Sequence, residues 1–223
     1  HIEVDGEKEL KNPWSSPLAP NGRPTSVASY NSLYKDLIHP PAMASWNEDS
    51  WFASMRVAGQ NPLLITAMTE LPSHFPVTEA DYAKTAVTGD SLATALAEGR
   101  LFIADYRIVG EIVKDNPAPA VGDYKYTPSP MALFGVRPDK GTLHPIAIQA
   151  GQDPKKFGII TPAQGNTADG WLWRCAKTAV QVTDANYHEL IAHLGRTHLI
   201  TEAVILASAR HLAPEHQITK LLM

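Results

Sequence analysis

Apolar residues near position 50 recur at the spacing of one helix face. The segment WFASM (51–55) predicts an amphipathic helix over about 46–58. Ser45 and Glu48, three residues apart, form a candidate capping box at the start of this helix. Gly59 is expected to end it.

Short helices are predicted in the loop-rich stretch that follows. Thr78 with Asp81, and Asp90 with Ser91, carry side chains that cap helix N-termini. Gly99 would end the second of these helices.

Three apolar runs predict β-strands. LFIADY (101–106) follows a helix stop, and ALFGV (132–136) and LHPIAIQ (143–149) flank the turn residues RPDKGT. The last two runs are therefore predicted to pair as a small β-hairpin subdomain.

The last part of the chain has few helix breakers after Asp169. Two long helices are predicted there, one over WLWRCAKTAVQVT (171–183) and one from 184 to about 211, so the fold class is mainly α. Residues 1–45, in contrast, are rich in Pro, Ser and Asn. They predict an extended N-terminal arm ahead of a helical domain over 46–223.

Composition excludes several classes of function. The 223 residues are 44% hydrophobic and 19% charged, as in ordinary globular proteins. The net charge is -4 and no basic run exceeds Lys155–Lys156, so no nucleic-acid partner is expected. The chain has no run of about 18 apolar residues and no signal-like N-terminus, which predicts no membrane span and leaves localisation open between cytoplasm and secretion. The lone Cys175 has apolar neighbours and is expected to be a buried core thiol.

The histidines of YHELIAHLGRTH have an unusual spacing. His188, His193 and His198 are each five residues apart. On a regular α-helix such a step turns successive side chains about 140° apart, and on a strand it sends them to opposite faces. The three rings can share a ligand only if the helix takes up an extra residue, as in a π-bulge.

The number of histidines favours a metal site. Five of the nine lie within 188–216, on or just beyond one apolar helix, where burial without a partner or a metal would be costly. Neutral imidazoles suit iron, zinc, copper and nickel, and the lack of cysteine ligands excludes sulfur-rich zinc sites.

Two shorter motifs receive structural interpretations. HELIAH resembles the zinc protease motif HExxH, but it has one residue too many for His188 and His193 to chelate together from a regular helix. GDSL (89–92) matches the short signature of a class of serine esterases, but a helix cap explains Asp90 and Ser91 without catalysis.

The order of residues around the histidines resembles the central signature of lipoxygenases, with its five histidines and trailing apolar LL. The resemblance covers roughly residues 30–223. The segments that carry it are WFASMRVAGQNPLLI, RLFIADY, YTPSPMALFGVRPDKGTLHPIAIQ and the stretch from WLWRC to KLL.

The resemblance implies a non-haem iron site in which His193 and His198 are metal ligands, brought to one side of the metal by a π-helical turn. Manganese is an alternative metal. Packing or outer-shell hydrogen bonds are expected of the other histidines of the series, His188, His211 and His216. Thr197 and Glu202, beside the ligand turn, are expected to support the helix. Five apolar side chains are expected to line a channel or the core: Trp51, Phe52, Met55, Leu194 and Leu199.

The activity implied is dioxygenation of polyunsaturated fatty acids to hydroperoxides, by hydrogen abstraction at the iron and addition of dioxygen. The resemblance further implies that this chain is the first half of a lipoxygenase catalytic domain of the compact bacterial type. The remaining ligands, a further histidine and a terminal carboxylate among them, would come from a C-terminal segment, either in the same chain or as a second chain. Catalytic and substrate-binding residues are not assigned.

A function of a different class is the alternative hypothesis. The chain could be a non-catalytic structural or binding half whose histidines only pack against a partner polypeptide. Metal analysis separates the two hypotheses, because only the enzyme requires a stoichiometric metal.

Overall fold

The structure is a computed structural model that describes residues 38–113 and 127–222. The chain divides into two units, His1–Trp46 and Asn47–Met223. Within the first unit, the described residues form the 3₁₀ helix η4 (Pro41–Ala44). The predicted arm over 1–45 lies almost wholly outside the described residues, and the sheet and the long helices belong to the second unit.

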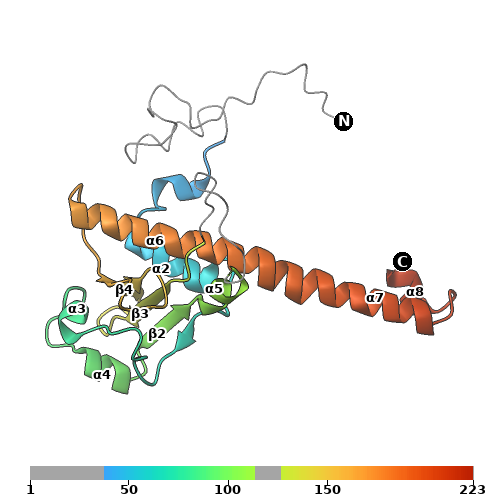
Figure 1. The fold of residues 1–223 in the computed structure, drawn as a ribbon, viewed down its shortest axis with the longest axis horizontal. Coiled ribbons are helices and arrows are strands. Elements are labelled where there is room, and N and C mark those ends of the chain that lie inside the picture. The colour runs from blue at the N-terminus through green and yellow to red at the C-terminus, as the bar shows by residue number, and fades with distance from the viewer. Residues whose placement is uncertain (1–37, 114–126, 223) are drawn as a thin grey trace, which may run out of the picture. The chain divides into compact units, whose positions relative to one another are not determined.

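A five-stranded antiparallel sheet forms the centre of this unit (Figure 1). Its strands, in the order in which they pair, are β1 (Thr66–Ala67), β2 (Leu101–Asp105), β3 (Met131–Val136), β4 (Leu143–Gln149) and β5 (Ile159–Ile160). The predicted hairpin is confirmed as β3 and β4. It is the middle of a larger sheet, because β2 adds to one side and β5 to the other.

Both faces of the sheet are buried, which explains the nearly continuous apolar runs of its central strands. Along β3, Ala132 and Phe134 belong to one core cluster and Met131 and Leu133 to the other, as the alternation of side chains on a strand requires. The first cluster is completed by helices α2 (Asp49–Ala58) and α6 (Ala168–Tyr187). The second is completed by α3 (Glu79–Ala83) and α4 (Leu92–Ala97), together with the loop before α3.

Helix α2 starts later than predicted. Its N-cap is Glu48, whose side chain makes no capping hydrogen bond, so the predicted capping box is wrong. Ser45 instead ends the preceding 3₁₀ helix, with its backbone N–H bonded to Ala42 O. The predicted stop at Gly59 is correct.

The two short helices begin where their capping residues predict. Thr78 and Asp81 form a reciprocal capping box on α3. The Ser91 hydroxyl accepts a hydrogen bond from the backbone N–H of Thr94 at the start of α4, so the GDSL serine is a helix cap. Gly99, with φ of 68°, follows the end of α4. Helix α5 (Arg107–Val113) was not predicted.

One continuous helical run replaces the two long helices predicted at the C-terminal end. Helix α6 passes directly into a π-helical segment, η5 (His188–Leu199), and then into α7 (Ile200–His211); the short helix α8 (Gln217–Leu222) follows a turn. The prediction failed because no Gly or Pro occurs between the two stretches, so nothing interrupts the backbone. The prediction of a long helix with a π-turn is confirmed.

Cys175 is exposed, contrary to the prediction of a buried thiol. The buried side of α6 is formed by Trp173, Ala176 and Val180. Cys175 lies two residues after Trp173, a step of about 200° on an α-helix, and therefore points away from the sheet.

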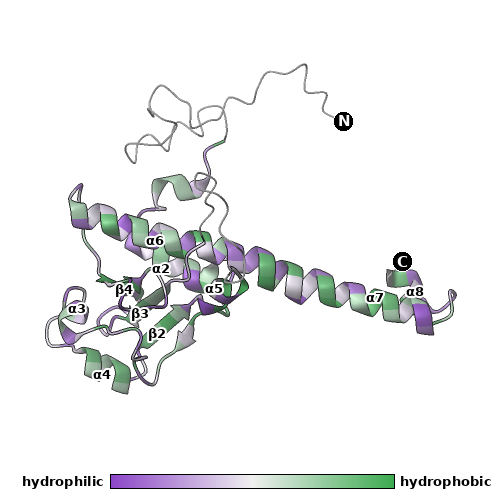
Figure 2. Cartoon of the chain, viewed as in Figure 1, coloured by the Kyte–Doolittle hydropathy of each residue, from purple (hydrophilic) through white to green (hydrophobic). Residues whose placement is uncertain are grey.

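The second half of the long helix has an exposed apolar surface (Figure 2). Leu194 and Leu199, expected to be core or lining positions, are 44% and 54% exposed in this chain, whereas Phe52 is buried. The run Ala168–His211 is long and apolar enough in one window to cross a membrane, by length and composition only. Core helices of soluble proteins pass the same test.

Candidate metal centre

The π segment brings His193 and His198 together. Their Nε2 atoms lie 2.9 Å apart, and their ring centroids 4.7 Å apart. A regular α-helix would direct these rings about 140° apart. A π-helix has one more residue in each hydrogen-bonded turn, so residues five apart lie on one face. The π geometry extends over twelve residues rather than a single turn.

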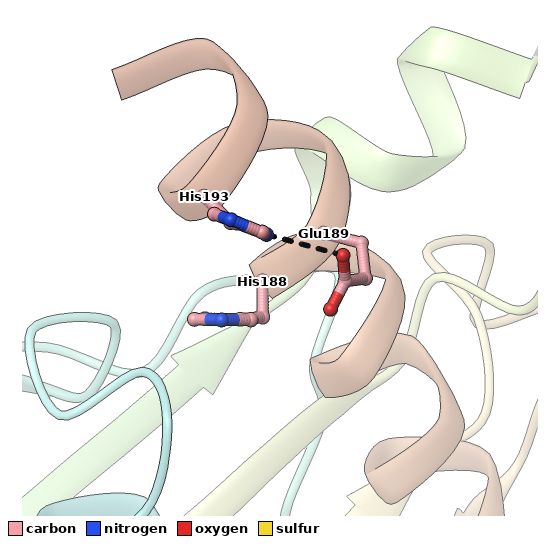
Figure 3. A group of neighbouring side chains, drawn as sticks. All are labelled: His188, Glu189 and His193. Atoms are coloured by element: carbon pink, nitrogen blue, oxygen red, sulfur yellow. Dashed lines mark hydrogen bonds and ion pairs between the residues drawn. The ribbon is translucent and has the colours of Figure 1, made fainter. Parts of the chain in front are cut away.

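Two neighbouring side chains, Thr197 and Glu189, contact His193. The Thr197 hydroxyl donates a hydrogen bond to the backbone carbonyl of His193. The Nδ1 of His193 lies 3.3 Å from Glu189 Oε2 (Figure 3). If Nδ1 of His193 carries the proton and donates it to Glu189, Nε2 is unprotonated and has a lone pair on the side of His198.

His188 lies closer to this group than the sequence suggested. Its ring stacks on that of His193 with centroids 5.7 Å apart. Ligand atoms of His188, Glu189 and His193 lie within 4.8 Å of one another (Figure 3). On a regular helix His188 and His193 could not face one ion, but η5 is π-helical and brings both rings to one side. Nδ1 of His188 is buried without a hydrogen-bond partner among the described residues.

The site is open in this chain. The His193 side chain is 46% exposed, and η5 has no buried residue among those described. The other two histidines of the series lie past this group. The ring of His216 accepts a hydrogen bond from the backbone N–H of Ile218 at the start of α8, and His211 is exposed at the end of α7.

A buried polar cluster next to η5 was not found from the sequence. Asp184, in the last turn of α6, forms an ion pair with Arg56 of α2 and accepts a hydrogen bond from Tyr106. The available signal was a charged residue four positions after Phe52, on the side of the predicted helix that packs against the core. Such a position is unusual unless a partner is buried with it.

Comparison with known proteins identifies the family. The sequence model of the family named Lipoxygenase matches residues 35–223. The chain belongs to the lipoxygenase family.

Individual lipoxygenases align with most of the chain. It is 37% identical over 213 residues to a linoleate 9/13-lipoxygenase of Pseudomonas aeruginosa, covering 93% of this chain and 31% of that protein. It is 35% identical to the allene oxide synthase-lipoxygenase protein of Plexaura homomalla, covering 88% of this chain and 20% of that protein. The chain therefore spans less than a third of the length of these relatives.

Solved lipoxygenase structures share its fold. A lipoxygenase variant crystallised with arachidonate superposes with a TM-score of 0.74 at 34% identity, over 88% of this chain and 30% of that one. A calcium-dependent 11R-lipoxygenase gives a TM-score of 0.71, also at 34% identity, over 86% and 27% of the two chains.

Proposed function

We propose that this lipoxygenase chain contributes two metal ligands, His193 and His198, to an enzyme that converts polyunsaturated fatty acids and dioxygen to hydroperoxides. The observation that carries the proposal is the 2.9 Å separation of their Nε2 atoms on a π segment. The family and the names of the relatives supply the class of reaction.

The two rings fit a shared metal ion. Imidazole nitrogens bind first-row metals at about 2.1 Å, so two such ligands at a right angle lie roughly 3 Å apart. The observed separation agrees with this value. The acceptor beside Nδ1 of His193 is also typical of metal-bound histidines, because it fixes the tautomer and the orientation of the ring.

Iron is the metal proposed, with manganese as the alternative. When bound, the metal supplies the one-electron chemistry that removes hydrogen from the fatty acid. The chain's own residues hold the ion: neutral imidazoles donate the lone pairs, and Glu189 and Thr197 hold His193 in place.

Further ligands must complete this site, since two imidazoles leave most of a coordination sphere open. We assign them to a C-terminal segment of the same protein, in one chain with these residues or as a second chain. The exposed apolar side chains of η5 and α7 support this assignment, because an apolar helix surface is normally covered.

Metal analysis of the complete protein tests the proposal. We expect one iron or manganese ion per polypeptide, and hydroperoxide products when the protein is incubated with linoleic or arachidonic acid in air. A protein that folds, contains no such metal and leaves both fatty acids unchanged would contradict the proposal. That result would favour the non-catalytic binding half.

A further inference from the structure

Asp184 is bound by side chains from two other parts of the fold. Its carboxylate forms an ion pair with Arg56 at 3.1 Å and accepts a hydrogen bond from the Tyr106 hydroxyl at 2.7 Å. Its backbone carbonyl accepts a hydrogen bond from the Asn61 amide at 2.7 Å. We call these four residues, Arg56, Asn61, Tyr106 and Asp184, the Asp184 clamp.

The clamp lies at the point where the α-helix changes to a π-helix. The carbonyl of Asp184 also accepts the backbone N–H of His188, the first residue of η5. The Asn61 side chain and the His188 backbone N–H therefore both donate to the same carbonyl, that of Asp184, at the end of the α-helical hydrogen bonds. Tyr187, next to His188, packs edge-on against the ring of Tyr106, with centroids 6.4 Å apart. Contacts from the core thus meet the helix at the point where η5 begins.

Stability alone does not explain a buried cluster of this kind. The side chains of Arg56 and Asp184 are 2% and 6% exposed. The cost of desolvating a buried ion pair is comparable to its attraction, so well-packed apolar residues would hold the helices together equally well. Hydrogen bonds, unlike apolar contacts, require a defined orientation of the groups that they join. Burial raises the pKa of Tyr106, so its hydroxyl remains a hydrogen-bond donor at neutral pH.

We infer that the Asp184 clamp positions the metal ligands: it fixes the rotation of the helix at the start of η5 and so directs His193 and His198 toward one ion. The inference rests on the metal site proposed above. Arg56, Asn61 and Tyr106 act through the helix and are positioning residues, since none of them belongs to the histidine group.

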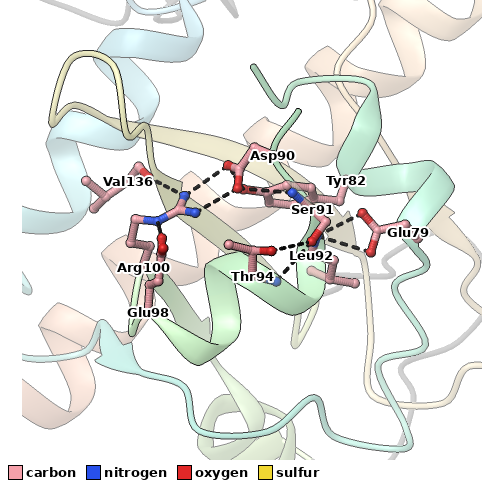
Figure 4. Close-up of polar contacts among 9 residues, drawn as sticks. All are labelled: Glu79, Tyr82, Asp90, Ser91, Leu92, Thr94, Glu98, Arg100 and Val136. Atoms are coloured by element: carbon pink, nitrogen blue, oxygen red, sulfur yellow. Dashed lines mark hydrogen bonds and ion pairs between the residues drawn. The ribbon is translucent and has the colours of Figure 1, made fainter. Parts of the chain in front are cut away.

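The chain contains a matched control for this clamp. Tyr82, Asp90 and Arg100 form a second tyrosine, aspartate and arginine cluster between α3, α4 and β2 (Figure 4). The Tyr82 hydroxyl donates to Asp90 at 2.7 Å, the same distance as from Tyr106 to Asp184. The Asp90 side chain is 5% exposed. This second cluster is not on the histidine helix. Its disruption is therefore expected to lower the stability of the protein without changing the position of the metal ligands.

The experiment compares Tyr106→Phe with Tyr82→Phe in the complete protein. Each variant loses one hydroxyl bonded to a buried aspartate. We expect Tyr106→Phe to weaken Fe²⁺ binding about tenfold in competition with a chelator, the size of the net contribution of one hydrogen bond to a charged group. Tyr82→Phe should leave the dissociation constant unchanged within about twofold, since Tyr82 bonds to Asp90 and not to the histidine helix. Equal metal affinities in the two variants would overturn the inference.

Hydrogen exchange of the metal-free protein provides a second, independent measurement. Amides of 188–199 should exchange faster in Tyr106→Phe and in Asn61→Ala, and at the unaltered rate in Tyr82→Phe. Unchanged exchange in both clamp variants would overturn the inference even if Tyr106→Phe proved too unstable for metal titration. Failure of the unaltered protein to bind iron would overturn the proposed function instead, while the exchange result would still decide whether the clamp holds η5.

Discussion

The two ring nitrogens of His193 have different surroundings, and this difference predicts how much each histidine contributes to metal binding. Nδ1 faces Glu189 and Nε2 faces His198, whereas His188 stacks on His193 from the side. We expect His193→Ala and His198→Ala each to abolish metal retention and turnover. His188→Ala should lower stability more than it lowers metal content. Metal content measured on purified variants checks this, and equal losses in all three would show that the ligands are wrongly assigned.

Asp90 predicts a pH dependence of stability. Its hydrogen bonds with Arg100, above all, lower the pKa of Asp90 to about 2. A carboxyl group whose pKa is lower in the folded state stabilises the protein above its unfolded pKa, about 3.9, and loses this contribution as pH falls toward 2. The melting temperature should therefore fall between about pH 4 and pH 2. In Asp90→Asn this part of the decline should disappear, and thermal melts at each pH would detect it; an identical pH profile in both proteins would contradict the assignment.

At the scale of elements, we expect the metal-binding geometry of the π segment to depend on Thr197. Its hydroxyl donates to the carbonyl of His193 four residues earlier, and a bond of this kind bends or loosens the helix at that turn. We expect Thr197→Val to weaken metal binding about tenfold, as loss of other outer-shell support does. Thr178 donates in the same way to Arg174 on α6, at 2.8 Å, so Thr178→Val is the matched control. Comparable metal dissociation constants for the two variants would count against a special role for Thr197.

The exposed surface of α7 and α8 predicts how the chain behaves alone. Large apolar side chains there are exposed, namely Ile200, Val204, Leu206, Ile218 and Leu221. Exposed apolar surface of this kind promotes association. Residues 1–223 expressed alone should therefore associate or precipitate, bind little iron, and give no rise in conjugated-diene absorbance with linoleate. A monomeric, iron-loaded and active preparation would refute the need for a further segment.

For the whole molecule, the sequence predicted what local chemistry determines. Thr78 and Ser91 marked two helix starts, and the five-residue histidine spacing predicted the π geometry. Errors arose where distant residues decide. Ser45 had a good capping sequence, but the helix begins at Asp49, which accepts hydrogen bonds from Trp173 and Lys177 of α6.

The clamp could not be predicted for the same reason. Arg56 and Asp184 are 128 positions apart in the sequence, and nothing in either local segment indicates that they pair. The exposure of Cys175 likewise depends on which side of α6 faces the sheet, and hydrophobic neighbours alone do not determine that side.

The long helix is continuous, with α6 packed in the core and η5 extending beyond it, so a small tilt of α6 moves the histidines by a larger distance. His193 lies nine residues beyond Asp184, at most roughly 14 Å away at the α-helical rise of about 1.5 Å per residue, because part of the span is π-helical. A tilt of about 5° at the Asp184 clamp would move the ring by roughly 1 Å at this radius. Misplacement of about 1 Å can cost a hundredfold in rate. Substitutions between α2 and α6 are therefore expected to change turnover, whereas core substitutions beneath α3 and α4 should change stability alone.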